Sequence, residues 1–162
     1  SINNNKGGEH PFMATLLTIS DIKKIEPNID EFGISDLSQE IADGQADVFR
    51  WLRANWWPLQ AYSKYDYKRM NIGANEPNED LYNASQLTRA AVYWTLGFHI
   101  MPKLAKFSEE MDMFERKMDF YRKEATRELD AVMQDGIEYD FDSSGTVTDA
   151  EKEPQYYLRL KR

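Results

Sequence analysis

The stretch LYNASQLTRAAVYWTLGFHIMPKL, residues 81–104, decides the fold. Its apolar residues cover nearly every face of a helical wheel, which is typical of a helix surrounded by other elements. Asn78 and the two acidic residues after it supply an N-cap and an acidic first turn, so the sequence predicts a helix start near Asn78. Pro102 predicts a kink or an early end. We therefore expect the central buried helix of a small all-α bundle.

A second apolar pattern, after residue 106, is the most regular in the chain. Its members recur in steps of three and four with charged residues between them, and they are Phe107, Met111, Phe114, Met118, Tyr121, Ala125, Leu129 and Val132. Gly136 is a natural C-cap. The pattern predicts a long amphipathic helix of roughly 28 residues that turns one stripe toward the bundle.

Two helices are predicted before the central one. The sequence TISD from residue 18 has the spacing of a capping box, which predicts a short helix over residues 20–25. A longer helix opens at Ser35 and ends at Pro58.

Tryptophan gives the longer of these helices a second aromatic face. Trp56 lies on its apolar stripe, whereas Trp51 and Trp57 lie off the stripe. The additional face is either core or a subunit contact. Because Trp is enriched at interfaces, we predict Trp51, Trp56 and Trp57 as partner-binding residues.

These elements predict a helical bundle over residues 16–139 with three appendages. They are a flexible N-terminal arm over residues 1–15, an acidic loop over residues 140–151, and an extended C-terminal arm over residues 152–162. The C-terminal arm alternates in the manner of a strand, and an isolated strand is either a frayed terminus or an arm that docks on a neighbouring subunit. The second interpretation predicts these partner-binding residues: Tyr156, Tyr157, Leu158, Arg159, Leu160, Lys161 and Arg162.

Composition limits the functions that the chain can have. A net charge of -8 argues against coating DNA or an anionic membrane, because both need clustered Lys and Arg. The absence of cysteine excludes disulfides, thiolate zinc sites and cysteine nucleophiles. The first residues lack the apolar core of a signal peptide, so we expect assembly inside a cell. No spacing pairs a nucleophile with a base, and His99 is expected to be a satisfied core residue, so no enzymatic activity is predicted.

The acidic loop DFDSSGTVTDAE, residues 140–151, matches the calcium loop of an EF-hand position by position. Gly145 occupies the sixth place, where the sharp turn needs a residue without Cβ. The predicted oxygen ligands are Asp140, Asp142, Ser144, Thr146, Thr148 and Glu151. Such ligands suit Ca²⁺, and an ion here would act as a structural clip, because no second loop is present to pair with this one. The alternative is an acidic turn whose residues only serve the turn geometry.

Three segments together resemble the head-to-tail connector (adaptor) proteins of tailed bacteriophages. The first is ADVFRWLRANWWP, residues 46–58, which resembles the family's helix that closes on an aromatic-Pro turn. The second is QLTRAAVYW, residues 86–94, which resembles its apolar middle helix. The third is the tyrosine-containing helix over residues 120–129, which runs into DGI at 135–137. The resemblance spans about residues 16–140, and the acidic loop and basic arm are not required by the family pattern.

The resemblance implies a non-enzymatic structural protein of the virion. Such a protein forms a homo-oligomeric ring of twelve subunits that joins the portal protein to tail or neck proteins. DNA would pass through the channel without specific binding, and no membrane would be involved. An acidic inner surface would let DNA slide by repulsion.

Two alternatives come from other classes of protein. A calcium-binding regulatory protein would use the acidic loop over residues 140–151. A binder of single-stranded nucleic acid would use the basic and aromatic residues between 62 and 69.

Overall fold

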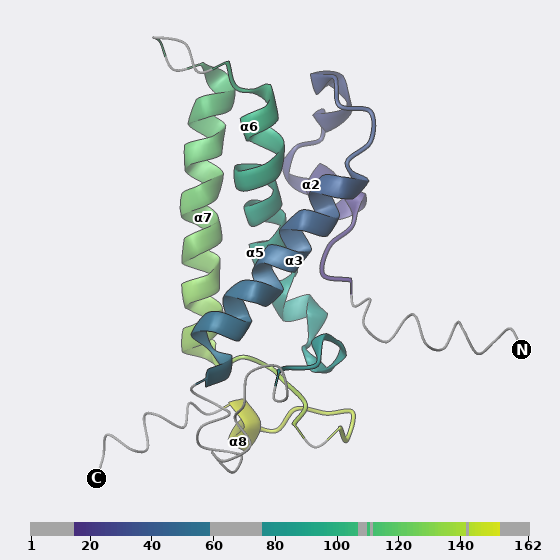
Figure 1. Cartoon of the computed structure of the whole chain (residues 1–162), viewed down its shortest axis with the longest axis vertical. Helices are drawn as coiled ribbons and strands as arrows, with labels where there is room; N and C mark the ends of the chain where they lie inside the picture. Colours follow the sequence, from purple (N-terminus) through teal and green to yellow (C-terminus); the bar gives the residue numbers. More distant parts are fainter. Residues whose placement is uncertain (1–14, 59–75, 107–109, 111, 142, 153–162) are drawn as a thin grey trace, which may run out of the picture. The chain divides into compact units, whose positions relative to one another are not determined.

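A computed structural model describes residues 15–58, 76–106, 110, 112–141 and 143–152, and over these residues the chain is all-α (Figure 1). This confirms the predicted fold class. The N-terminal arm up to residue 14, the segment 59–75 and the C-terminal arm from residue 153 lie outside the described residues, so the predictions made for them are untested.

The described residues belong to two compact units. Of the described residues, the bundle unit comprises 15–48, 84–106, 110 and 112–132, and the aromatic unit comprises 49–58, 76–83, 133–141 and 143–152. The boundary falls within two long helices, α3 (Ser38–Asn55) and α7 (Met113–Asp135).

Four helical segments form the bundle unit (Figure 1). They are α2 (Ile19–Ile25), the first part of α3, the continuous run of α5 (Ala84–Thr95), η4 (Leu96–Ile100) and α6 (Met101–Leu104), and most of α7. A short 3₁₀ helix, η1 (Ile29–Phe32), connects α2 to α3. The α5–α6 run is the predicted central helix, since several of its side chains have no exposed surface: Leu87, Ala91, Leu96, Ile100 and Met101.

The start of the central helix differs from the prediction. Asn78 does act as a cap, because its side chain accepts the Asp80 N–H at 2.9 Å, but it caps only the short 3₁₀ helix η3 (Glu79–Leu81). Tyr82 is extended and forms an antiparallel bridge with Tyr139, so α5 begins only at Ala84. A contact with a distant segment therefore overrides the local start signal.

The sequence predicts a kink or an early end at Pro102, and the helix ends two residues after it. The helix continues through Pro102 to Leu104, and the turns before it widen into the π-helix η4, where the Met101 N–H bonds to the Leu96 carbonyl. A π-helical turn changes the register of the side chains that follow it, and such turns are rare in proteins.

Local capping sets the first residues of α2 and α7. In α2, the Thr18 N–H donates to Asp21 Oδ2 at 2.9 Å, as the predicted capping box requires. α7 is shorter than the roughly 28 residues predicted, because a second box of Asp112 and Glu115 opens it at Met113. The predicted buried stripe of α7 is confirmed for Met118, Tyr121, Ala125, Leu129 and Val132.

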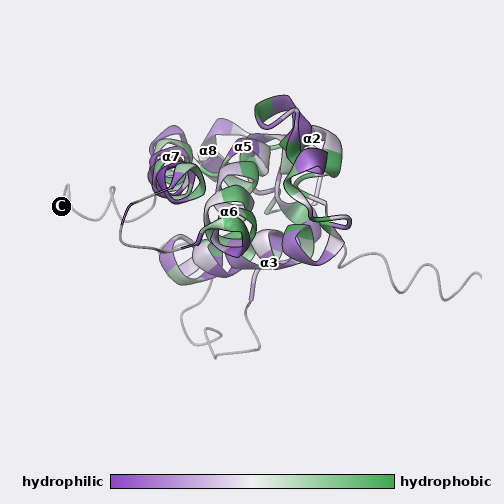
Figure 2. Cartoon of the chain, turned by 90° about the horizontal axis from the view of Figure 1, so that it is seen from above, coloured by the Kyte–Doolittle hydropathy of each residue, from purple (hydrophilic) through white to green (hydrophobic). Residues whose placement is uncertain are grey.

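Polar contacts join the helices of the bundle unit, and apolar residues lie on the sides where the helices face one another (Figure 2). The buried Glu26 carboxylate accepts hydrogen bonds from Lys117 Nζ and from the Tyr121 hydroxyl of α7. Asp47 Oδ2 of α3 accepts the Trp94 indole N–H at 2.9 Å and lies 2.7 Å from His99 Nε2. The expected core histidine is therefore half-buried and paired with a carboxylate.

Aromatic rings form the core of the aromatic unit. Trp56 has its ring centroid 5.7 Å from that of Tyr82 and 5.5 Å from that of Tyr139. Trp57 stacks on Phe141 at 6.0 Å with an interplanar angle of 9°. These rings join the end of α3 to the segments around residues 82 and 140, and so they position the acidic loop.

Candidate functional site

The acidic loop is attached at its first end to the segment that precedes α5. Beside the bridge of Tyr82 and Tyr139, the Asn83 N–H donates to the Glu138 carbonyl at 2.9 Å, and the Asp140 N–H donates to the Leu81 carbonyl at 3.0 Å. The first predicted ligand, Asp140, thus has a fixed backbone position.

The second end of the loop is attached through Lys152, the last residue of α8 (Asp149–Lys152). Its N–H donates to the Thr148 carbonyl at 3.3 Å, and its Nζ lies 3.6 Å from Glu138 Oε2. Gly136 packs closely on the Lys152 backbone, since a Cβ at Gly136 would come 2.9 Å from the Lys152 carbonyl oxygen. The second end of the loop is therefore held by residues 136–138, which directly precede its first end.

The loop curls around the carboxylate of Asp140. Its Oδ1 accepts the Ser144 N–H at 3.0 Å, and its Oδ2 accepts the Gly145 N–H at 2.7 Å. Gly145 has a φ of 93°, in the left-handed region that glycine adopts without strain. The loop thus has the tight turn that an EF-hand requires at its sixth place.

The other predicted ligands are only partly described. Ser144, Thr146 and Thr148 are exposed, and the Ser144 hydroxyl donates to the Thr146 carbonyl at 3.1 Å. Asp142 and the side chain of Glu151 lie outside the described residues. Within the part of the chain that is described, no group of three His, Cys, Asp or Glu side chains is close enough to hold a metal ion.

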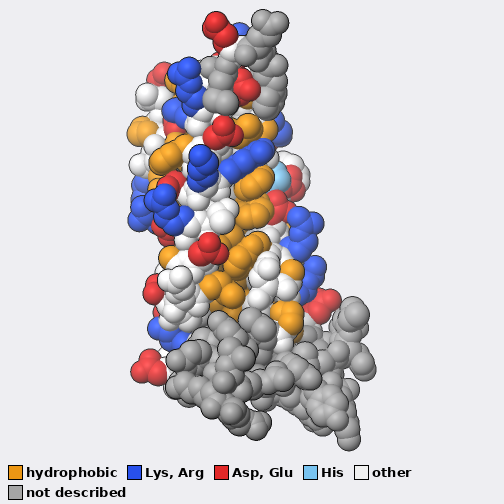
Figure 3. Space-filling view, turned by 90° about the vertical axis from the view of Figure 1, so that its left-hand side faces the viewer, with side chains coloured by type: hydrophobic (Ala, Val, Ile, Leu, Met, Phe, Trp, Pro, Cys, Tyr) orange, Lys and Arg blue, Asp and Glu red, His pale blue; other side chains and the backbone are white. Residues whose placement is uncertain are grey.

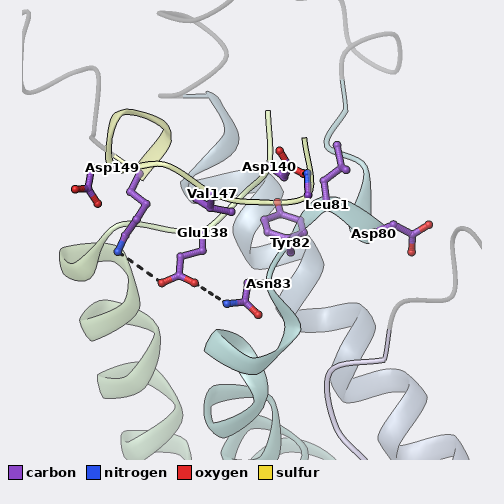
Figure 4. A pocket seen from close by; sticks show the side chains of 10 residues that line it. Asp80, Leu81, Tyr82, Asn83, Glu138, Asp140, Val147 and Asp149 are labelled. Atoms are coloured by element: carbon purple, nitrogen blue, oxygen red, sulfur yellow. Dashed lines mark hydrogen bonds and ion pairs between the residues drawn. The ribbon is translucent and has the colours of Figure 1, made fainter. Parts of the chain in front are cut away.

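A pocket of about 540 Å³ opens between the acidic loop and the segment over residues 80–83 (Figure 4). Carboxylates dominate its lining, which includes Asp80, Glu138, Asp140 and Asp149. Lys152 is a cation in the lining, and it is paired with Glu138. Leu81 and Val147 add apolar surface. We call this hollow the acidic pocket.

Two groups beside the pocket show the effect of burial and of like charge. Burial raises the pKa of the Glu79 carboxyl, and the neighbouring Asp80 raises this pKa further. Burial likewise raises the pKa of the Tyr82 hydroxyl, which has no hydrogen-bond partner among the described residues. The contribution of Asp80 shows that neighbouring carboxylates repel each other here, and a cationic partner group would relieve this repulsion.

The predicted partner-binding tryptophans need a correction. Trp56 and Trp57 are 3% and 7% exposed, so they belong to the aromatic core and not to a free surface. Trp57 is buried because Tyr139 and Phe141, which are remote in sequence, cover it. Trp51 is half-buried. The predicted partner-binding residues 156–162 lie outside the described residues.

Sequence reasoning missed two features. One is the acidic pocket, for which only the density of carboxylates around residues 79–80 and 138–149 was a signal. The other is the solvent-facing side of α7, where Met113 and Phe120 are 51% and 54% exposed. Exposed large apolar residues at an interval of seven are visible in the sequence, but the regular buried stripe on the opposite side dominated the pattern.

Within the described residues, no helix is both long enough and apolar enough to span a membrane. Comparison with protein-family models, with curated proteins and with solved structures finds no match for this chain.

Proposed function

We propose that this chain is a ring-forming head-to-tail adaptor of a tailed-phage virion, which joins the portal to tail or neck proteins and lines the DNA exit channel. The observation that carries the proposal is the resemblance over about residues 16–140. Its three segments coincide with the end of α3, with α5 and with the second half of α7. They thus lie on three helices of an all-α chain, as the adaptor family requires.

Charge is a second support for the proposal. A ring around a channel that conducts DNA must not hold the phosphate backbone, and a net charge of -8 repels it. The acidic pocket and the acidic loop concentrate negative charge in the aromatic unit. A structural role also agrees with the extensive hydrogen bonding of the charged groups inside the bundle unit, such as Glu26 and Asp47.

The proposal is tested by assembly. Native mass spectrometry and negative-stain electron microscopy are carried out on the purified chain, alone and with purified portal rings of the same virus. We expect closed rings of twelve copies on the portal. The chain alone can remain monomeric, since ring subunits can assemble only after they bind the portal. Failure to associate with portal rings and failure to form rings alone would together refute an adaptor function.

A second candidate function, the binding of calcium, is favoured by the geometry of Asp140. Its carboxylate already organises the loop by accepting the N–H groups of Ser144 and Gly145. In this arrangement the loop needs little reorganisation to bring further oxygens around an ion. A bound Ca²⁺ would join the end of α7 to the residues after the loop.

Calcium binding is measured by titration calorimetry and by terbium luminescence sensitised by the nearby Trp56 and Trp57. The variant Glu151→Gln should lose binding at least tenfold, because it removes the bidentate twelfth-place ligand. Asp149→Asn is the matched control, since its position in the loop donates no ligand. Equal binding by both variants, or none by the parent chain at millimolar Ca²⁺, would refute this candidate.

A further inference from the structure

The solvent-facing side of α7 carries a continuous stripe of apolar and basic residues. At steps of three and four residues, the exposed positions are Met113, Arg116, Phe120, Lys123 and Arg127. Such steps place all five on one side of a helix. Figure 3 looks onto the side of the molecule where α7 lies and shows cationic side chains in blue beside apolar ones in orange. We call these five residues the α7 ridge.

The ridge is unusual for this chain in two ways. Phe120, at its centre, is 54% exposed, although burying such a ring would gain about 1.5–3 kcal/mol. Arg116 and Lys123 lie one turn on either side of Phe120, and none of the five ridge residues is acidic, in a chain whose net charge is -8. An exposed aromatic residue between two cations has the composition of an interface anchor.

Among the described residues, the structure shows no ion pair for Arg116 or Lys123, whereas Arg127 pairs with Glu124 at 3.0 Å. The central cations of the ridge are therefore available to an acidic partner. No pairing with another described residue neutralises them.

The acidic pocket has the complementary properties. Its carboxylates include Asp80 and Asp149, which are exposed, and its apolar lining residues are Leu81 and Val147. A volume of about 540 Å³ is large enough for an aromatic side chain. A hollow that combines these two apolar side chains with carboxylates can accept a ring and also pair with cations on either side of that ring.

We propose that the α7 ridge of one copy docks on the acidic pocket of a second copy, with Phe120 as the anchor and with Arg116 and Lys123 opposite Asp80 and Asp149. This inference rests on the proposed function, because it supplies the head-to-tail contact that a ring of adaptor subunits needs. Two different patches of one chain that complement each other form a heterologous interface, which closes into a ring when the rotation between copies allows.

The first test uses the absence of cysteine from the chain, which makes any introduced thiol unique. One preparation carries Lys123→Cys and another carries Val147→Cys, and the mixture is treated with a short bis-maleimide. We expect a cross-linked dimer that needs both variants and that decreases at least tenfold when Phe120→Ala is added to the Lys123→Cys chain. Ala42→Cys, exposed on α3 rather than on α7, is the control partner for Val147→Cys.

The second test exchanges charge. Arg116→Glu with Lys123→Glu places two carboxylates on the ridge, and Asp80→Lys with Asp149→Lys places two cations at the pocket. Each double variant alone should lose ring formation, as measured by native mass spectrometry, while the chain with all four substitutions should regain it. All four residues are exposed, and circular dichroism verifies that every variant is folded.

The outcomes separate this inference from the proposed function. Rings that form normally in both double variants would overturn the inference and leave the adaptor function intact. Equal cross-linking of the Ala42→Cys control would also overturn the inference. Absence of any assembly, with or without portal rings, would overturn both. Specific cross-linking together with recovery of rings in the fourfold variant would establish the contact.

Discussion

Gly44 of α3 lies against Thr95 of α5 so closely that a Cβ atom at Gly44 would come 1.9 Å from Thr95 Oγ1. Thr95 has no exposed surface, and its hydroxyl donates to the Ala91 carbonyl at 2.8 Å, so the side chain has a fixed rotamer. The glycine therefore permits the close approach of two helices in the bundle unit.

Gly44→Ala should destabilise the chain by about 1–3 kcal/mol through overpacking. The direction of the change in unfolding free energy is informative, because the same substitution in an unobstructed helix interior would stabilise the chain by about 1 kcal/mol. Urea denaturation followed by circular dichroism measures the free energy of unfolding. Adding Thr95→Ala should recover part of the loss, because it removes Oγ1 but leaves a Cβ that lies 2.9 Å from the new methyl group. A stabilised Gly44→Ala variant would contradict the close approach.

The sequence could predict those parts of the fold that depend on local spacing. The buried character of residues 84–104, the stripe of α7 and the capping box at Thr18 all follow from neighbours within a few residues. The failures involve distant partners. Tyr82 is not helical because it bridges to Tyr139, and Trp57 is not on a surface because Phe141 stacks on it.

The candidate site shows the same division. The curl of the loop around Asp140 is local and was readable from residue types at fixed places. The acidic pocket combines residues 80–83 with residues 138–152, which no periodicity connects. The Asp112 cap on α7 was readable in principle from the spacing of Asp112 and Glu115, but the apolar pattern that continues before it suggested a longer helix.

Asp47→Ala should destabilise the chain by about 1–3 kcal/mol, because it leaves the half-buried Trp94 indole N–H and His99 without their shared acceptor. The emission of Trp94 should also change as its N–H loses the carboxylate. Chemical denaturation followed by tryptophan fluorescence reports both effects. Asp43→Ala, one turn earlier on α3 and exposed, is the control and should lose much less stability. Equal losses in the two variants would show that the shared acceptor contributes nothing specific.

The stability of the chain should decrease as the pH rises above about 10. Burial raises the pKa of the Tyr121 hydroxyl above its usual 10.0, and the hydrogen bond to Glu26 raises it further. The unfolded chain then loses its phenol proton first, so this stabilisation is complete below the unfolded pKa and is lost as the pH rises above that value. Tyr121→Phe should flatten the decrease in the urea midpoint between about pH 9 and pH 11, with a residual slope from Tyr82, whose pKa is raised by burial. An unchanged slope in the variant would contradict this assignment.

Gly136→Ala should be more damaging than Gly33→Ala, although both glycines have a φ of 95°. The left-handed backbone alone costs an alanine about 1–2 kcal/mol at either position. At Gly33 a Cβ would meet nothing within 4 Å, so the backbone cost is the whole effect there. At Gly136 the Cβ would also come 2.9 Å from the Lys152 carbonyl oxygen, which must move and take α8 with it. Thermal denaturation gives the difference between the two variants, and limited proteolysis shows where the chain opens. We expect faster cleavage within residues 143–152 in Gly136→Ala alone, because the new methyl group displaces the contact with Lys152 that holds the second end of the acidic loop. Equal proteolysis of the two variants would mean that Lys152 does not hold the loop.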